Sequence, residues 1–344
     1  MATRLAPFGA SGGLRTPRAV VRLCLVLTVF GLALPASAPA SAQELTLKYQ
    51  AARLVLPPQR KPLMRAFVPR IPLGAELLRP ASVHDLQHIF RTRDYDLTGV
   101  RQTEQAVPRL YVSELPRDFG DLGDVRAHKA VFLRVLLPLV LMANEEIDAL
   151  RRRALGLVHR EAGGQALFAA DRAWLEELAV RYGVDNGDRD DFVRRLDRIP
   201  VGLALAQAVQ ESGWGRSRFA RKGNALYGQR TWRHKIPGLV PMRREVDERH
   251  RVRAYPDLMS AARSYMHNLN THPAYAEFRA LRAYMRARGE PLDGARLARA
   301  LVRYAEEGPV YVEALHAIMR ANALTAFDRA KLSSWKLARA GNTG

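Results

Sequence analysis

The chain has 344 residues, and its 54 lysines and arginines outnumber 34 aspartates and glutamates, which gives a net charge of +20. With 48% apolar and 26% charged residues, the composition excludes a disordered or collagen-like chain. Only one apolar run approaches the length of a membrane span, so a polytopic membrane protein is excluded too. The single cysteine excludes a disulfide framework and a thiolate metal site. We therefore expect a soluble, basic protein of one or two domains.

Residues 1–42 have the pattern of a secretory signal. Four arginines and no acidic residue precede or border the apolar run Leu23–Leu34, and Ala40-Ser41-Ala42 forms a small-residue cleavage site. The apolar run is only about a dozen residues long and ends at Pro35, which is too short to span a membrane. We predict cleavage after residue 42, export to the periplasm or cell envelope, and no stable membrane span in the mature chain.

Removal of the signal leaves a net charge of +16, carried almost entirely by arginine. A basic charge of this size often indicates a nucleic-acid partner. An exported protein rarely meets nucleic acid, so we predict none. The charge instead favours attraction to an anionic polymer or surface at the cell envelope, with a generally solvated basic surface as the equal alternative.

The region before the main helices is rich in proline. Prolines between residues 57 and 72 exclude a long helix there, so residues 43–105 are predicted to form a linker of low order with one short helical piece near Val83–Phe90. Residues 106–198 are predicted to be helical. Apolar residues recur at helical intervals over Val125–Ala149, with a kink expected at Pro138. Two further helices are predicted at about Ala169–Tyr182 and Asp190–Asp197.

The core domain is predicted over residues 199–325. Pro200 can begin a helix, and Val201–Gln210 is apolar almost all round, which indicates a buried helix. Residues 226–255 lose the helical period and favour a small β-hairpin lobe. Helices then return at about Ser260–Asn270, Pro273–Arg288, Leu292–Tyr304 and Val310–Asn322. The predicted fold class is α+β, mostly α-helical, with a small β-hairpin lobe and a C-terminal tail over residues 326–344.

Glu211 follows the buried helix and is the only ionisable side chain between Arg198 and Arg216. An apolar environment and the negative end of the helix dipole both disfavour its charged form, so we expect a raised pKa. A general acid at neutral pH needs such a pKa, and protonation of a glycosidic oxygen is the reaction that most often uses it. The alternative is an exposed helix-end glutamate without a role. The following Ser-Gly-Trp-Gly215, with small residues and an aromatic face for a sugar, counts against that alternative.

Several motifs in order make the sequence similar to a known family. Residues 206–215 (AQAVQESGWG), 217–220 (SRFA) and 224–228 (NALYG) resemble the N-acetylglucosaminidase family of peptidoglycan hydrolases, which includes flagellar and autolytic cell-wall enzymes. Residues 131–153, 267–275 (HNLNTHPAY) and 303–311 (RYAEEGPVY) extend the likeness to the bacterial Bax-like proteins of that family. The resemblance covers about residues 107–325.

The resemblance implies a lysozyme-like fold and hydrolysis of the β-1,4 bond after N-acetylglucosamine in peptidoglycan, without a cofactor. It places the catalytic acid on Glu211. The family's second carboxylate lies in the β-lobe, where the candidates are Glu245, Asp247 and Glu248, and Glu245 falls nearest the expected place. An N-acetyl group of the substrate can also act as the nucleophile, so one carboxylate can suffice. The spacing leaves open whether the reaction retains or inverts the anomeric configuration.

Tyr304 matches a tyrosine that lines the family's active site and supports the sugar in the transition state. By itself, the sequence around Tyr304 is typical of an aromatic residue at the end of an amphipathic helix. Trp214 and Tyr227 are predicted stacking walls for the sugar, with anchoring of the core as the alternative for both. Asn224 is a further predicted substrate-binding residue. Glu306 and Glu307 stand where the family often has Thr-Asp, and no role follows for them.

Two other classes of function are compatible with these residues. A lytic transglycosylase would keep Glu211 and need no second carboxylate. A non-catalytic module that binds peptidoglycan glycan strands would need no acid at all. A metal site is not expected, because His84 and His88, which have a ligand-like spacing, lack the glutamate and the third ligand of a zinc site. The oligomeric state is left open.

Overall fold

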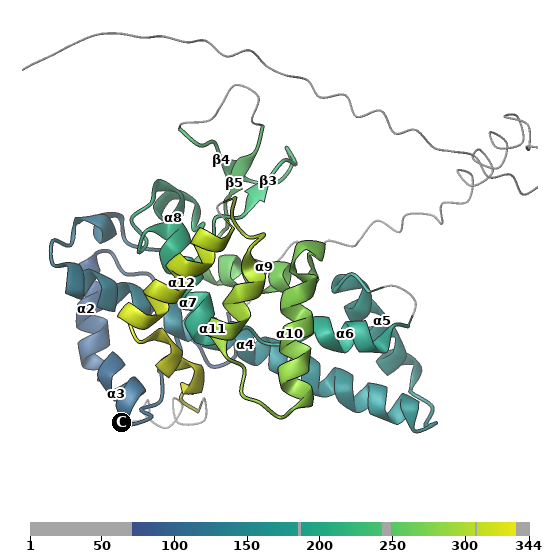
Figure 1. The fold of residues 1–344 in the computed structure, drawn as a ribbon. Coiled ribbons are helices and arrows are strands. Elements are labelled where there is room, and N and C mark those ends of the chain that lie inside the picture. The colour runs from purple at the N-terminus through teal and green to yellow at the C-terminus, as the bar shows by residue number, and fades with distance from the viewer. Residues whose placement is uncertain (1–70, 185–186, 243–248, 307, 335–344) are drawn as a thin grey trace, which may run out of the picture. The chain divides into compact units, whose positions relative to one another are not determined.

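The computed structural model describes residues 71–184, 187–242, 249–306 and 308–334 (Figure 1). This part of the chain is mostly helical with small sheets, as predicted. The elements, with η for 3-10 helices, are β1 (Glu76–Leu78), α2 (Val83–Thr92), α3 (Leu97–Gln102), β2 (Leu110–Val112), η1 (Arg117–Asp121), α4 (Val125–Ala162), α5 (Ala169–Arg181), α6 (Arg189–Arg195), α7 (Val201–Ser212), α8 (Arg218–Gly223), β3 (Arg230–Thr231), β4 (Gly238–Leu239), β5 (Arg251–Arg253), α9 (Leu258–Thr271), η2 (Pro273–Tyr275), α10 (Ala276–Ala287), α11 (Gly294–Ala298), η3 (Arg299–Leu301), α12 (Pro309–Ala321) and η4 (Leu324–Arg329).

Residues 76–102 form part of the folded core. Strand β1 pairs in parallel with β2, and α2 begins with a capping box in which the Ser82 hydroxyl and the Asp85 carboxylate satisfy each other's backbone N–H. Leu86 and Phe90 on one face of α2 are buried, and α2 contacts α4. The predicted helical piece near residues 83–90 is confirmed. Over residues 76–102 the structure differs from the predicted low-order linker, because no proline stands between Pro80 and Pro108 and the amphipathic helix α2 forms there.

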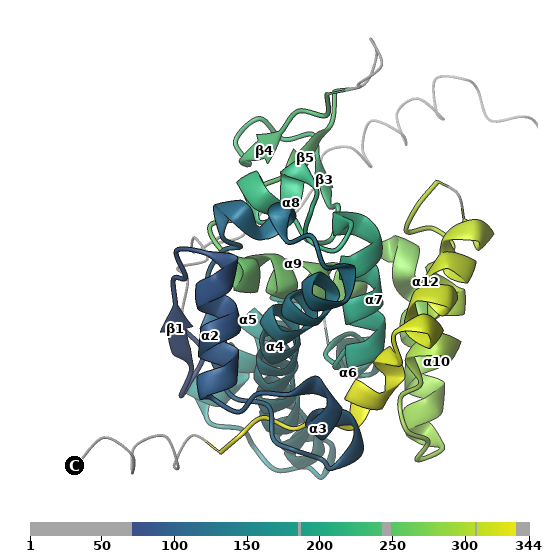
Figure 2. The same cartoon turned by 90° about the vertical axis from the view of Figure 1, so that its left-hand side faces the viewer.

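Helix α4 is the longest described element, with 38 residues and a length of about 57 Å. Figure 2 shows α2 and α7 on opposite sides of α4, and α4 contacts α7, α9 and β2. The predicted helix over residues 125–149 is confirmed, and it continues to Ala162. Pro138 lies buried inside it. None of the helices in the described ranges combines the length and the apolar content needed to cross a bilayer.

Helix α7 lies at the centre of the packing and is buried on nearly all sides, as predicted from its sequence. Asn144 of α4 fixes its entry, because the side-chain amide donates to the Ile199 carbonyl at 2.7 Å and accepts from the Ile199 N–H at 3.0 Å. Gly202 lets η4 approach closely, since a Cβ at this position would lie 2.8 Å from the Leu324 carbonyl oxygen. The start of α7 is therefore held between α4 and η4.

The segment that follows residue 325 also packs against the core. Residues 326–329 belong to η4, in which Phe327 is fully buried, and Leu332 forms a bridge with Val107. As far as residue 332, the predicted C-terminal tail over residues 326–344 is packed on the core. A buried phenylalanine and a backbone bridge explain the difference, because both depend on partners more than 100 residues away. Residues 335–344 lie outside the described residues.

Asp328 closes the start of α7, where its Oδ1 accepts a hydrogen bond from the Gly202 N–H at 2.8 Å. Burial raises the pKa of Asp328 to about 6, while the hydrogen bonds from Gly202 and Val201 oppose the rise and the charge of Asp293 adds to it. A carboxyl whose pKa is raised on folding stabilises the fold only while it is protonated. Its favourable contribution is therefore complete below about pH 4 and is lost as the pH rises towards and through about 6.

Replacing Asp328 with asparagine should therefore help the fold more at higher pH, since the amide oxygen can still accept from Gly202 and no charge is buried. We expect the difference in melting temperature, variant minus wild type, to increase between pH 4 and pH 6.5 and to level off above pH 7. Thermal unfolding of both proteins across this pH range measures the difference. A difference that stays constant with pH would contradict the raised pKa.

The small sheet inserted after α8 has three antiparallel strands in the order β3-β5-β4. The predicted β-lobe is thus confirmed, with three short strands in the described part of it. Residues 243–248, which hold the predicted second carboxylates, lie outside the described residues. The helices predicted after Pro256 are also found, as α9, η2 with α10, α11 with η3, and α12.

A buried ion cluster joins α6, α4 and α10. Asp197 is 2% exposed, and its carboxylate receives two hydrogen bonds from Arg286, at 2.9 and 3.1 Å. Arg151 and Arg282 bring a guanidinium nitrogen to within 3.9 Å of it. Arg282 is fully buried and donates to the backbone carbonyls of Arg194, Asp197 and Arg198 near the end of α6. The cluster therefore fixes the segment that leads directly into α7.

Candidate active site

Glu211 lies in the last turn of α7 and is half-buried, while the α7 residues before Gln210 are buried. The helix ends at Gly213, which adopts a left-handed conformation with φ of 57° and donates its N–H to the Val209 carbonyl. The chain thus turns away directly after Glu211. This places one carboxylate at the edge of an apolar helix, next to solvent-accessible space.

Gly228 lies directly against this carboxylate. It has a φ of +61°, and a Cβ built on it would collide with Glu211 Oε2 and lie 3.3 Å from Glu211 Cδ. Only glycine leaves room for the carboxylate at this backbone approach. The loop from α8 to β3 therefore forms one wall beside Glu211.

A chain of hydrogen bonds reaches Glu211 from the core. Gln207 is one helical turn before Glu211, on the same face of α7, and is fully buried. Its Oε1 accepts from the Tyr265 hydroxyl at 2.7 Å, and its Nε2 donates to the Tyr311 hydroxyl at 2.9 Å. Tyr311 in turn hydrogen-bonds Glu211. The Tyr311 hydroxyl oxygen accepts from Gln207, so its hydrogen is left to donate to the Glu211 carboxylate.

Tyrosine side chains surround the carboxylate on this side. The rings of Tyr304 and Tyr311 stack with centroids 5.4 Å apart, and Tyr275 lies 5.8 Å from Tyr304. Burial is the main cause that raises the pKa of the Tyr265, Tyr304 and Tyr311 hydroxyls. Neighbouring tyrosines and the negative charge of Glu211 raise these pKa values further. These hydroxyls keep their protons at neutral pH and are available as donors. The site therefore offers one carboxyl group, held by a fixed O–H donor, beside an aromatic wall.

Tyr304 lies near Glu211, whose negative charge contributes to the raised pKa of the Tyr304 hydroxyl. Its side chain is half-buried, and its hydroxyl donates to the Tyr227 backbone carbonyl at 2.9 Å. This bond ties the turn after η3 to the loop that carries Gly228. The role of Tyr304 in supporting the sugar stays a prediction.

Tyr227, in contrast, is part of the core. Its ring is 2% exposed and stacks on Tyr265, with centroids 3.9 Å apart and planes 6° from parallel. A ring covered in this way presents no open face to a sugar. The prediction of a stacking wall at Tyr227 is therefore wrong in this structure, and the alternative, core anchoring, describes it. Through its backbone carbonyl it positions Tyr304 instead.

The contacts of Trp214 and Asn224 in the structure are packing and capping contacts with residues other than Glu211. The Trp214 ring packs edge-on against Phe132 of α4, and Lys129 lies over its face at 4.8 Å. Asn224 ends α8 in a left-handed conformation, and its side-chain amide donates to the Tyr255 carbonyl at 3.1 Å. These contacts explain both residues as elements of packing and capping. Their predicted binding of substrate stays a prediction.

The remaining carboxylates of the predicted site are not placed. Glu245, Asp247, Glu248 and Glu307 lie outside the described residues. Glu306 forms an exposed ion pair with Arg230 at 2.8 Å, which links the turn after Tyr304 to β3. No cluster of three or more histidine, cysteine, aspartate or glutamate side chains able to hold a metal occurs within the described ranges. The assignment of Glu245 as second catalytic group stays a prediction.

Sequence reasoning missed the residues that orient Glu211, namely Gln207, Gly228, Tyr265 and Tyr311. Gln207 carried a usable signal, because a polar side chain four residues before a candidate acid shares its face on the helix. Tyr311 ends the motif at residues 303–311, but its role depends on how α12 packs against α7, which the sequence does not show.

Comparisons with known proteins give one family match and one homologue. Residues 193–324 match the family described as mannosyl-glycoprotein endo-beta-N-acetylglucosaminidase, so this part of the chain is a glucosaminidase domain. The chain is also homologous to Protein bax of Escherichia coli (strain K12). The two are 29% identical over 242 residues, which cover 67% of this chain and 78% of that protein. No solved structure gave a match. The resemblance inferred from the motifs is thereby confirmed.

Replacing Gly228 with alanine should displace the Glu211 carboxylate and lower glycan cleavage by up to about 100-fold, the cost of a misplacement of about 1 Å. Gly289→Ala is the matched control, because Gly289 also has a positive φ, of +66°, but its Cβ would meet no atom within 4 Å. Activity and melting temperature are measured for both variants. Equal losses of activity in the two would show that backbone strain alone is responsible.

Proposed function

We propose that this chain is an exported peptidoglycan hydrolase with a lysozyme-like core, which cleaves the β-1,4 glycosidic bond after N-acetylglucosamine in cell-wall glycan. The observation that carries the proposal is the Glu211 carboxyl group, held between Gly228 and the Tyr311 hydroxyl at the end of a buried helix. The glucosaminidase match over residues 193–324 supports a glycan substrate. The sequence pattern of residues 1–42 supports export.

In the proposed mechanism Glu211 donates its proton to the glycosidic oxygen of the bond that breaks. Tyr311 and Gln207 hold the carboxyl group in one orientation, which keeps the proton directed at the leaving oxygen. Tyr304, half-buried and tied to the Tyr227 carbonyl, lies where it can contact the sugar as positive charge develops on the ring. The hydrogen bond from the Tyr304 hydroxyl to the Tyr227 carbonyl holds the Tyr304 ring in place, so the proposed role of Tyr304 is to position the sugar.

The second half of the reaction needs a nucleophile or an activated water. A carboxylate of residues 245–248 would serve, with Glu245 as the preferred candidate. The N-acetyl group of the substrate is the alternative, because it can attack the anomeric carbon from within the sugar. The proposal assigns the first step to Glu211 in either case.

Mass spectrometry of purified peptidoglycan after digestion tests the proposal. The full chain should release fragments that end in reducing N-acetylglucosamine, and Glu211→Gln should release almost none. Fragments with anhydro-muramyl ends would instead identify a lytic transglycosylase that uses the same acid. Retained binding to the wall without any fragments, from the wild type and the variant alike, would identify a non-catalytic binding module.

A further inference from the structure

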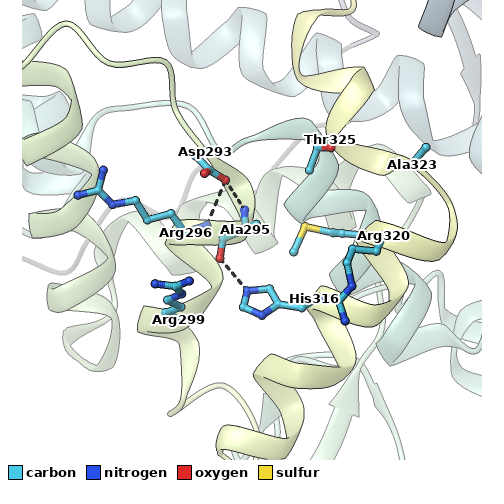
Figure 3. Close-up of a pocket in the computed structure, with 9 residues that line it drawn as sticks. Asp293, Ala295, Arg296, Arg299, His316, Arg320, Ala323 and Thr325 are labelled. Atoms are coloured by element: carbon cyan, nitrogen blue, oxygen red, sulfur yellow. Dashed lines mark hydrogen bonds between the residues drawn. The ribbon is translucent and has the colours of Figure 1, made fainter.

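A cavity of about 450 Å³ opens at the other end of α7 from Glu211. It is lined by α11, η3, α12 and residues 323–325, and we call it the basic pocket (Figure 3). Its lining residues are Asp293, Ala295, Arg296, Arg299, His316, Met319, Arg320, Ala323 and Thr325. A volume of this size is typical of sites for small molecules.

The basic pocket is separate from the site around Glu211. Its walls pack on the first turn of α7, where a Cβ on Gly294 would lie 3.2 Å from the Leu203 side chain and one on Gly202 would lie 2.8 Å from Leu324. Glu211 stands ten residues after the start of α7, which corresponds to about 15 Å along the helix. A ligand in the basic pocket would therefore leave the catalytic carboxyl group uncovered.

Most charged groups of the basic pocket are already engaged with protein. Asp293 Oδ1 accepts from the backbone N–H groups of Ala295 and Arg296, at 2.8 and 3.1 Å, and so caps α11. The Arg296 guanidinium pairs with Glu290 at 2.8 Å. His316 hydrogen-bonds the Ala295 carbonyl through Nε2 at 2.7 Å. Each of these contacts fixes a wall of the cavity.

Arg299 and Arg320 differ from the other charged groups. Both are exposed, and the described residues supply neither guanidinium with a hydrogen bond or a carboxylate. They come from different elements, η3 and α12, and Figure 3 shows them on the two sides of the His316 ring. Two like charges beside one cavity repel each other, and an anion between them removes that cost.

We propose that the basic pocket binds the phosphate group of a phosphomonoester, with Arg299 and Arg320 as its ligands. The planar fork of a guanidinium matches two phosphate oxygens, and a tetrahedral phosphate presents oxygens to two guanidinium groups from different directions. A carboxylate, with two oxygens in one plane, is satisfied by a single guanidinium. The cavity is larger than a phosphate ion, so it also accommodates a small polyol or sugar attached to the phosphate.

Isothermal titration calorimetry of the full chain with glycerol 3-phosphate tests the proposal. We expect binding with a stoichiometry of one, and at least tenfold weaker binding by the double variant Arg299→Gln/Arg320→Gln. The control is Arg126→Gln/Arg172→Gln, which removes the same charge from two exposed arginines outside the basic pocket. Its affinity should equal that of the wild type. Equal weakening in both double variants would reduce the effect to net charge and overturn the proposal.

Two further probes identify the group that is bound. Glycerol should not bind, and the dicarboxylate glutarate should bind at least tenfold more weakly than glycerol 3-phosphate. Equal affinity for glutarate would overturn the assignment of phosphate, and no heat from either anion would overturn the site itself.

Phenylglyoxal modification, mapped by mass spectrometry, gives a readout on the unaltered protein. Glycerol 3-phosphate should protect Arg299 and Arg320, whereas Arg126 and Arg172 should react as before.

Discussion

Replacing Glu211 with glutamine is expected to lower the rate of the proposed peptidoglycan cleavage by about 10²- to 10⁴-fold, which is the usual contribution of a positioned general acid. Glutamine has the same shape, and its amide oxygen can accept the hydrogen bond from Tyr311, so the fold should be kept. The amide carries no proton that it can transfer to a glycosidic oxygen. The release of reducing ends from purified peptidoglycan, measured at saturating substrate, gives the rate.

Glu313→Gln is a suitable control for this variant. Glu313 lies on α12, two residues after Tyr311, and is exposed. Its replacement removes the same charge from the same helix region without touching the hydrogen-bond chain through Gln207, so the rate should stay within about twofold of the wild type. A Glu211→Gln protein that binds peptidoglycan, melts as the wild type does and still cleaves at the wild-type rate would exclude Glu211 as the acid.

The largest effect on stability is expected from Asp197. Replacing it with asparagine should lower the free energy of unfolding by about 3–5 kcal/mol, because it leaves a fully buried Arg282 without its counter-charge. Burial already lowers the pKa of Arg282 to about 10. Urea unfolding of the wild type and the variant measures the loss. Glu177→Gln, which breaks the exposed pair with Arg181, is the control and should change the free energy by less than about 0.5 kcal/mol.

The contribution of Asp197 should also depend on pH. Burial alone would raise the pKa of Asp197, but the hydrogen bonds from Arg286 and the charges of Arg282 and Arg151 outweigh it and lower the pKa. A carboxylate with a lowered pKa stabilises the fold above its unfolded value near 3.8, and this stabilisation is lost as the pH falls through the folded value. The difference between wild type and Asp197→Asn should thus be constant from pH 5 to 8 and shrink below pH 4. A difference that persists unchanged at pH 2–3 would contradict this account.

The elements with local signals could be predicted from the sequence. Helix α7 was predicted over Val201–Gln210 and extends over Val201–Ser212, because Pro200 and Gly213 mark its two ends within the sequence itself. Apart from the helical piece near residues 83–90, the order in residues 76–102 and 326–332 could not be predicted in the same way. Those segments are short, and they fold because Phe90 and Phe327 are buried against elements that lie far away in the sequence.

In the candidate site, too, features with a local sequence signal could be predicted and features that depend on packing could not. Glu211 stood out because it was the only ionisable group beside a long apolar helix, and Tyr304 was identified through the family resemblance. The orientation of Glu211 could not be predicted, because it depends on which face of α7 meets Tyr311 and on the backbone of Gly228. Tyr227 was misassigned for the opposite reason. An aromatic residue near an acid looks the same in the sequence whether its ring is open or stacked on Tyr265.

The packing of α4 limits which gene segment can be transferred to another protein with the glucosaminidase domain still folded. The glucosaminidase match begins at residue 193, yet α7 and α9 within it pack against α4, which ends at Ala162. A gene segment that encoded residues 193–324 alone would carry Glu211 but would leave apolar faces of both helices in water. The matched domain of this chain therefore depends on α4 for the burial of part of its apolar surface. Recombination that preserves activity would have to move α4 together with the matched domain.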